Sequence, residues 1–173
     1  REVDPRYPDP TPAFVPQFFA GIRAEADAVE HYRRLERRTR ETCRMGAWVT
    51  PRVRQWALDR TEQVSVKANR VFDDIDVLLT PSIAHRPPTV GILGGRGTVS
   101  SALAAMPAIA YAALWNVAGN PAASVPCGIA PDGLPTAVQL VGRTDDEATL
   151  LSLSAQIEAA RPFPTWSAQP AGS

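Results

Sequence analysis

The 173-residue sequence contains little cysteine, little histidine and almost no lysine. Cys43 and Cys127 are too few and too isolated for a disulfide framework, which favours a reducing compartment and predicts a cytoplasmic protein. The two histidines, His31 and His85, do not pair with these cysteines at ligand spacing, so no metal site is expected. No apolar run approaches the roughly 18 residues that a membrane helix needs. No signal peptide opens the chain, so no membrane partner is expected.

The sequence also lacks an excess of charge of one sign. Eighteen basic and eighteen acidic residues give a formal net charge of zero, so no global field attracts nucleic acid or anionic lipid. The arginine-rich stretch 33–44 is interleaved with acids and is typical of a solvated helix face rather than a nucleic-acid surface. Lys67 is the only lysine, and this arginine bias with abundant Ala and Pro is typical of a GC-rich bacterial genome.

What is present predicts about one domain with a buried core. Residues 1–16 contain five prolines and are expected to form a connector, with a polyproline ligand as the alternative. Residues 17–162 are expected to form the folded portion and residues 163–173 a loose tail. The chain starts with Arg1 rather than Met and resembles the middle of a protein, so a processed or shortened chain is expected.

Hydrophobic periodicity and turn residues predict a mixture of helices and strands. Helices are expected over about 18–48, from the N-cap Thr50 and Pro51 to about 72, over 100–113, and from a capping box at Thr144–Glu147 to Pro162. Strands are expected over 76–80, 123–125 and 136–141, the last two joined by a turn at Pro131–Gly133. The apolar run 76–80 favours a buried strand of a mixed or parallel sheet.

Several familiar chemistries are poorly supported by the sequence. The glycine-rich stretch 91–100 lacks the lysine of a phosphate-binding loop, and a flexible loop is the better interpretation. A triad of Ser82, His85 and Asp76 has no G-x-S-x-G elbow to support it. Cys127 has no histidine nearby in the sequence to activate it.

The most informative stretch is 115–142, WNVAGNPAASVPCGIAPDGLPTAVQLVG. It resembles the C-terminal segment of the amidase signature family of serine hydrolases, which commonly reads N-x-x-G-x-P-A-x-S-x-P-x-G and then G-L-P-x-G-x-Q-x-x-G. The matching residues are Asn116, Gly119, Pro121, Ala122, Ser124, Pro126, Gly128, Gly133, Leu134, Pro135, Gln139 and Gly142. Ala137 departs from the pattern, because a second glycine is usual there. Residues 75–88, IDVLLTPSIAHRPP, resemble the family phrase D-x-L-L-x-P-T, with Ser82 in place of Thr.

The resemblance implies part of an α/β/α sandwich around a large mixed β-sheet, incomplete in this chain. It implies that the intact enzyme hydrolyses a carboxamide through an acyl-serine intermediate with no metal or organic cofactor. The family's catalytic Lys and two Ser lie upstream of this segment. Ser100 and Ser101 lack the flanking glycines of that motif and Lys67 lies in a helix pattern, so no catalytic residue is assigned to this chain.

The resemblance also implies a substrate-binding role for two segments beside the acyl-binding cleft. The predicted residues are Thr80, Pro81, Ser82, Ile83, Tyr111, Trp115 and Asn116. Core packing is the alternative for Tyr111 and Trp115. The expected partners are the missing N-terminal portion of the same enzyme and a small-molecule amide, and a homodimer is left open. The alternative function is a non-catalytic scaffold, or a component related to the amidase-like chain of tRNA-dependent amidotransferases.

Overall fold

The computed structural model describes residue 2 and residues 6–163, which form two compact units. We call residues 1–71 and 83–119 the helical unit, and residues 72–82 and 120–173 the sheet unit. Each unit is described by itself. The predicted tail at 163–173 lies, apart from Phe163, outside the described residues.

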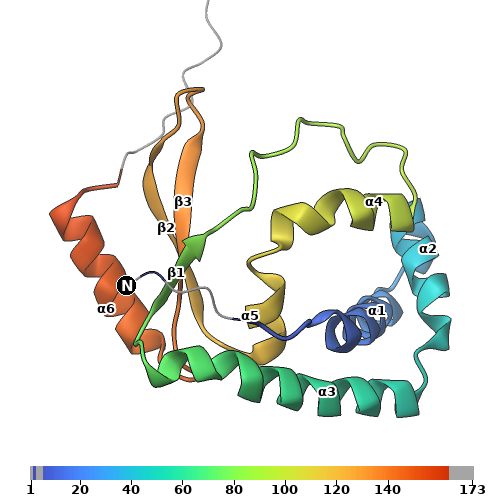
Figure 1. Ribbon diagram of the computed structural model, residues 1–173. Helices are drawn as coiled ribbons and strands as arrows, with labels where there is room; N and C mark the ends of the chain where they lie inside the picture. Colours follow the sequence, from blue (N-terminus) through green and yellow to red (C-terminus); the bar gives the residue numbers. More distant parts are fainter. Residues whose placement is uncertain (1, 3–5, 164–173) are drawn as a thin grey trace, which may run out of the picture. The chain divides into compact units, whose positions relative to one another are not determined.

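The helical unit is built around α1 (Thr11–Asp27), α2 (Arg37–Met45) and α3 (Pro51–Asn69), as Figure 1 shows. Short 3-10 turns lie at Tyr32–Arg34 and Gly46–Trp48, and a third, at Arg70–Asp73, follows α3. Later in the chain come α4 (Thr98–Ala105), a 3-10 turn at Met106–Ile109, and α5 (Ala113–Ala118). Helix α3 packs against both α1 and α5, and α2 packs against α1 and α4.

Small side chains allow α1 and α3 to approach closely. Ala13 of α1 and Ala57 of α3 are both fully buried, and Ala68 is nearly so. Gln17 of α1 donates a hydrogen bond to Thr61 Oγ1 of α3 at 2.7 Å. A polar contact between helices therefore accompanies the apolar packing.

The beginning of α1 differs from the sequence expectation. The predicted connector extended to residue 16, but the helix starts at Thr11 and includes Pro12 and Pro16. Pro12 lies in the first turn, where a proline loses no helical hydrogen bond, and Pro16 gives up one such bond inside the helix. Asp9 accepts a hydrogen bond from the Thr11 amide at 2.9 Å. Hydrogen bonds from the Thr11 side chain, and to a smaller extent from its backbone, lower the pKa of Asp9.

Two other helical predictions need correction. The helix expected over 18–48 is interrupted between Asp27 and Arg37, in a segment with neither glycine nor proline to signal a break. The helix expected over 100–113 is divided at Met106–Ile109, where Pro107 removes a backbone donor. The start of α3 is confirmed, because the Thr50 side chain accepts a hydrogen bond from the Val53 amide and Pro51 is the first helical residue.

The sheet unit contains β1 (Leu78–Pro81), β2 (Ala122–Ile129), β3 (Pro135–Val141) and α6 (Glu147–Ala160). Within the described residues the strand order is β1-β3-β2, and both pairings are antiparallel. The predicted turn at Pro131–Gly133 is confirmed, with Gly133 at φ +82°. The strand expected over 76–80 is present as β1, at one edge of the described sheet, with Leu78 buried and Leu79 62% exposed. Burial of both its faces, which requires further neighbouring strands, stays a prediction.

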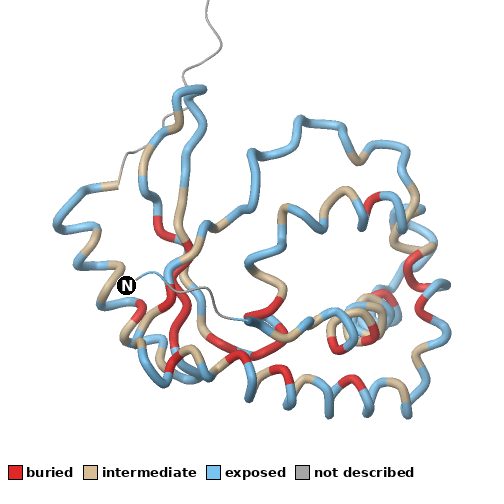
Figure 2. Tube along the Cα trace, viewed as in Figure 1, coloured by how far each residue is buried: buried red, intermediate tan, exposed pale blue. Residues whose placement is uncertain are grey.

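Helix α6 covers one face of this sheet. Val125, Leu140 and Leu150 form its core, and Leu153 and Ile157 pack against them. Figure 2 shows the buried residues of β3 running into the segment before α6. The helix begins differently from the expected capping box: Asp146, not Thr144, is the N-cap and accepts hydrogen bonds from the Thr149 amide and hydroxyl. It ends at Ala160, two residues before Pro162, as predicted.

Candidate functional site

A row of polar side chains crosses the three strands of the sheet unit. Thr80 of β1 is opposite Gln139 of β3, and Gln139 is in turn opposite Ser124 of β2. Side chains alternate along a strand, so this row lies on the face opposite Val138, Leu140 and the covering helix α6. Gln139 Nε2 donates a hydrogen bond to Thr80 Oγ1 at 3.2 Å, and the Gln139 side chain is buried.

Ser82 extends the row beyond the end of β1. Its backbone amide donates to the Ala137 carbonyl oxygen, which continues the ladder of β1 and β3 by one residue. Its hydroxyl shares a hydrogen bond of 2.9 Å with the Ser124 hydroxyl, across the intervening strand. Ala137, in that strand, has only a methyl side chain, so little side-chain volume separates the two serines. We call Thr80, Ser82, Ser124 and Gln139 the polar row.

Hydrogen bonds fix the strand that carries Ser124. Asn120 Nδ2 donates to the Gly142 carbonyl oxygen at 2.9 Å, and the Gly142 amide donates to the Pro121 carbonyl oxygen at 3.0 Å. These bonds connect the residues before β2 to the residue after β3. The two strands of the 115–142 motif are therefore joined directly at this end, and the polar row lies just beyond that junction.

The polar row can orient a substrate but contains no base of its own. Hydroxyl and amide groups donate and accept hydrogen bonds, which suits recognition of a carbonyl or an amide N–H group. Thr80 and Ser82 were predicted to bind substrate, and the structure brings them together with each other in this row. Pro81, between them, is exposed on β1.

The remaining predicted binding residues belong to the helical unit. Trp115 of α5 is only 3% exposed and packs edge-to-face with Tyr7, with ring centroids 5.5 Å apart. Its burial favours the core-packing alternative. Tyr111 and Ile83 are exposed, at 40% and 44%, and Asn116 is exposed on α5.

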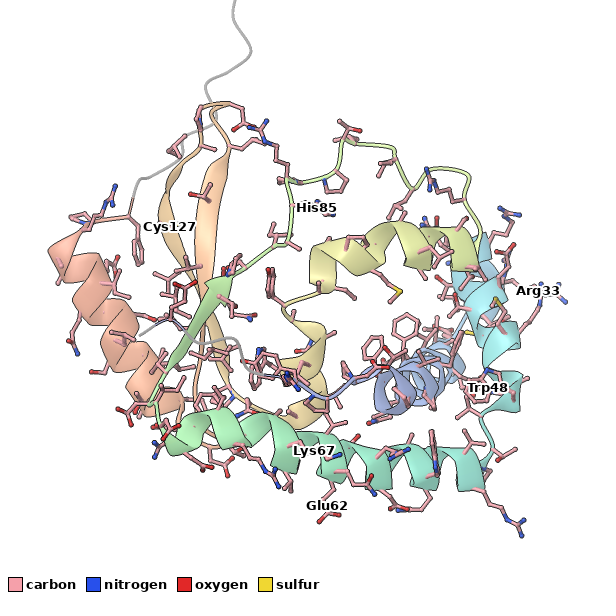
Figure 3. The ribbon with its side chains drawn as sticks, in the orientation of Figure 1. Arg33, Trp48, Glu62, Lys67, His85 and Cys127 are labelled. Carbon is pink, nitrogen blue, oxygen red and sulfur yellow. The ribbon has the colours of Figure 1, made fainter. Side chains whose placement is uncertain are left out.

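The serines considered as nucleophiles have structural partners in the helical unit. Ser101 is buried and its hydroxyl accepts a hydrogen bond from Arg38 at 2.9 Å, which connects α4 to α2. The Ser100 hydroxyl donates to the Gly97 carbonyl oxygen at the start of α4. Lys67 is an exposed residue of α3, labelled in Figure 3.

The hypothetical triad has other hydrogen-bond partners. Asp76 forms an ion pair with Arg143 at 3.2 Å, Ser82 bonds to Ser124, and His85 Nδ1 contacts the Arg86 carbonyl oxygen. Figure 3 shows His85 on the segment between β1 and α4 and Cys127 on β2. Among the described residues no cluster of three His, Cys, Asp or Glu side chains could hold a metal. None of the helices described there is long and apolar enough to cross a membrane.

Sequence reasoning missed two members of the polar row. Ser124 and Gln139 are both motif positions, but they were not assigned to a site. The signal was available in their spacing: each alternates with the apolar residues of its short strand, and the turn at Pro131–Gly133 joins the two strands. Only the register, which shifts between Pro126 and Gly128, shows that the two residues are opposite each other.

Comparison with known proteins identifies relatives along most of the chain. The family model described as Amidase matches residues 19–151. Two Mycobacterium tuberculosis proteins, named "Putative amidase AmiB2" and "Putative amidase AmiA2", are 48% and 34% identical over 92% and 84% of this chain. These matches cover 35% and 30% of the two relatives, so the chain spans about a third of their length.

Solved structures give the same result for the fold. A 6-aminohexanoate cyclic dimer hydrolase is similar with a TM-score of 0.77 and 25% identity, over 93% of this chain and 38% of the other. A bacterial aryl acylamidase of the amidase signature family is similar in fold, with a TM-score of 0.63 and 23% identity, over 88% of this chain and 34% of the other. The predicted α/β class is confirmed, with this chain forming part of a larger fold.

Proposed function

Because the chain belongs to the amidase signature family, we propose that the intact protein hydrolyses a carboxamide C–N bond through an acyl-serine intermediate. In this proposal a serine hydroxyl supplied from outside the chain attacks the amide carbonyl and the amine departs. Water then hydrolyses the acyl-serine and releases a carboxylic acid. The catalytic Lys and two Ser belong to the N-terminal portion, which is the first partner we propose for this chain.

The observation that carries the proposal is the convergence of three motif segments in one row. Thr80 comes from the D-x-L-L-x-P segment, Ser124 from the S-x-P segment and Gln139 from the G-L-P segment. The strand register places them opposite one another, and a hydrogen bond connects Thr80 to Gln139. A shared polar surface accounts for the presence of these residue types in all three segments. We infer that the surface positions the amide substrate.

The chain's own role in this proposal is binding rather than proton transfer. Ser101 connects α4 to α2, Ser100 bonds locally at the start of α4, and the sole lysine is exposed on α3. Thr80, Pro81, Ser82 and Ile83 remain proposed substrate-binding residues, together with Tyr111 and Asn116. Ser124 and Gln139 join them. We place the intact enzyme in the cytoplasm, with neither a metal nor an organic cofactor in the reaction.

The test uses the intact protein and a series of simple carboxamides that differ in acyl size. We expect some members to be hydrolysed. Ser82→Ala and Ser124→Ala should each change the ratios of kcat/KM between members, and so their ranking, by about three- to tenfold. This is the effect expected when a hydrogen bond of roughly 1 kcal/mol is lost. Ser152→Ala, on the exposed side of α6, is the matched control and should leave the ranking unchanged. All three variants should melt close to the wild type.

Two outcomes would each count against one part of this proposal. Hydrolysis with an unchanged ranking in both variants would remove the polar row from the substrate site but leave the amidase proposal intact. No hydrolysis of any carboxamide would favour the alternative, a non-catalytic component of a complex.

A further inference from the structure

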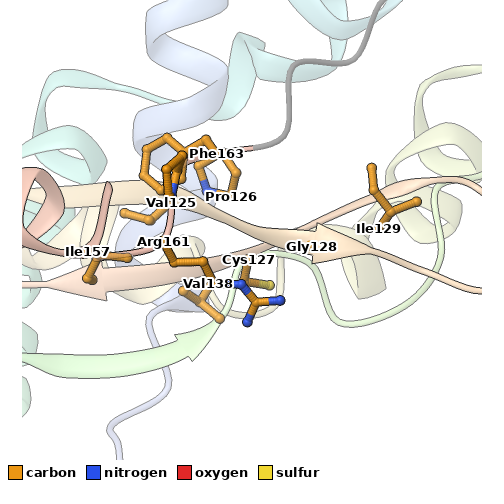
Figure 4. Close-up of a pocket in the computed structure, with 10 residues that line it drawn as sticks. Val125, Pro126, Cys127, Gly128, Ile129, Val138, Ile157, Arg161 and Phe163 are labelled. Carbon is orange, nitrogen blue, oxygen red and sulfur yellow. The ribbon is translucent and has the colours of Figure 1, made fainter. Parts of the chain in front are cut away.

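The sheet unit contains a groove that the proposed reaction does not use. It lies where α6 ends and the hairpin of β2 and β3 continues, and it has a volume of about 440 Å³ (Figure 4). Pockets that bind small molecules are typically about 300–1,000 Å³ and mostly apolar. The groove is therefore large enough for a small ligand.

A β-bulge shapes the floor of this groove. Pro126 is opposite Ala137 and Gly128 is opposite Thr136, so Cys127 is an extra residue without a register partner. Gly128 has φ +153°, a conformation that side-chain-bearing residues rarely adopt. All five residues from Val125 to Ile129 line the groove, and the bulge lies in the middle of this stretch.

The chemistry of the lining is apolar with a single cation. Val138, Ile157 and Phe163 contribute hydrocarbon surface, and Figure 4 shows the Arg161 side chain extending along the groove. Among the described residues that line the groove, Arg161 is the only charged one, and it is exposed. An apolar body with one negative charge is the complementary ligand, because a guanidinium pairs with a carboxylate through two parallel hydrogen bonds.

We propose that this groove binds a monocarboxylate with an apolar or aromatic body, with its carboxylate at Arg161 and its hydrocarbon against Val138, Ile157 and Phe163. A phosphate ester fits less well, since a dianion needs more donors than one exposed guanidinium supplies. The thiol of Cys127 lies within the same groove and donates a weak hydrogen bond to Thr136 Oγ1 at 3.4 Å. Its accessibility therefore reports on whether the groove is occupied.

The test measures alkylation of Cys127 by N-ethylmaleimide in the intact protein, followed on the Cys127 peptide by mass spectrometry. The probe is 4-phenylbutyrate, compared with the neutral 4-phenylbutanol and with acetate. We expect 4-phenylbutyrate to slow alkylation of Cys127 at least fivefold at saturation, the alcohol to be weaker and acetate to have no effect. Cys43, which is buried in the helical unit, is the internal control and should not respond.

The charge is tested with Arg161→Gln against Arg54→Gln, an exposed arginine of α3 that does not line the groove. Arg161→Gln should raise the half-protecting concentration of 4-phenylbutyrate by about two- to fivefold, the range for an exposed ion pair. Arg54→Gln should not change it. Unprotected Cys127, equal protection by acid and alcohol, or an equal response of Cys43 would each overturn the proposal. Because the measurement is of binding, its failure is separate from any loss of hydrolysis.

Discussion

Trp115 differs from two other tryptophans of the chain in its surroundings. Its side chain is 3% exposed and in contact with Tyr7, whereas Trp48 and Trp56 are 48% and 47% exposed. A buried indole removes much more apolar surface from water than a half-exposed one does. We therefore assign Trp115 to the core of the helical unit, and leave Tyr111 as the aromatic residue of that segment that a ligand can contact.

Trp115→Ala in the intact protein should lower the free energy of unfolding by about 3–5 kcal/mol, the usual cost of truncating a buried large aromatic residue. Trp56→Ala is the matched control and should cost less than about 1 kcal/mol, the value of its exposed contact with Arg60. Thermal or denaturant unfolding gives both values. A Trp115→Ala protein that melts normally but ranks amides differently would return Trp115 to the binding site.

The sequence showed which residues belong to the motif better than it showed which of them are in contact in the fold. The motif letters indicated that Ser124 and Gln139 belong to a special segment, but a motif does not contain a strand register. Thr80 and Gln139 are 59 residues apart, and their contact depends on which strands pair. Burial of Trp115 was equally inaccessible, because an aromatic residue beside a small-residue run is compatible with both a core and a pocket.

Elements with strong local signals were predicted well, and elements decided by packing were not. Thr50 and Pro51 begin α3 as expected, and the Pro131–Gly133 turn joins β2 and β3. The prolines at the start of α1 favoured a connector over 1–16, but this prediction is wrong from Thr11 onward, because proline is compatible with both a linker and the first turn of a helix. The position of β1 at an edge of the described sheet depends on its neighbours and not on its own apolar sequence.

Gly142 is the last residue of the motif, and there is little room for a side chain at this position. A Cβ added there would lie 3.2 Å from Leu150 Cγ, in the core between β3 and α6. Gly142→Ala should therefore lower the free energy of unfolding by about 1–3 kcal/mol, as overpacking does. Gly21→Ala is the matched control: it lies in α1, where a Cβ would meet nothing within 4 Å, and should stabilise the helix by about 0.5–1 kcal/mol.

The two substitutions are chemically identical but should change the free energy of unfolding in opposite directions. Unfolding of each variant in denaturant measures both changes. A stabilised Gly142→Ala protein would show that Leu150 moves aside and that the motif glycine has another purpose.

At the scale of the whole molecule, the described residues expose many large apolar side chains. On α4 and the turn after it, Val99, Leu103 and Met106 recur at helical spacing and are all more than half exposed. In the described sheet β1 and β2 each have one edge without a neighbouring strand. The chain also spans only about a third of the length of its curated relatives. These features support the proposal that further chain covers these surfaces in the intact protein.

The 173-residue chain expressed alone should therefore aggregate or bind a hydrophobic dye, because exposed strand edges and apolar patches favour association. The intact protein, with the same segment in place, should remain soluble and bind little dye. Dye fluorescence and light scattering at equal molar concentration compare the two. A monodisperse chain that unfolds cooperatively would show that this segment is a complete domain.

We propose that this chain belongs to a serine amidase whose nucleophile lies outside these 173 residues. Treatment of the intact protein with a serine-directed fluorophosphonate, followed by peptide mapping, tests it most directly. We predict one labelled serine, outside this chain, with the same labelling in a protein that carries Ser100→Ala and Ser101→Ala. A label on Ser82, Ser100, Ser101 or Ser124, or no labelled serine in a protein that still hydrolyses amides, would contradict this assignment of the nucleophile.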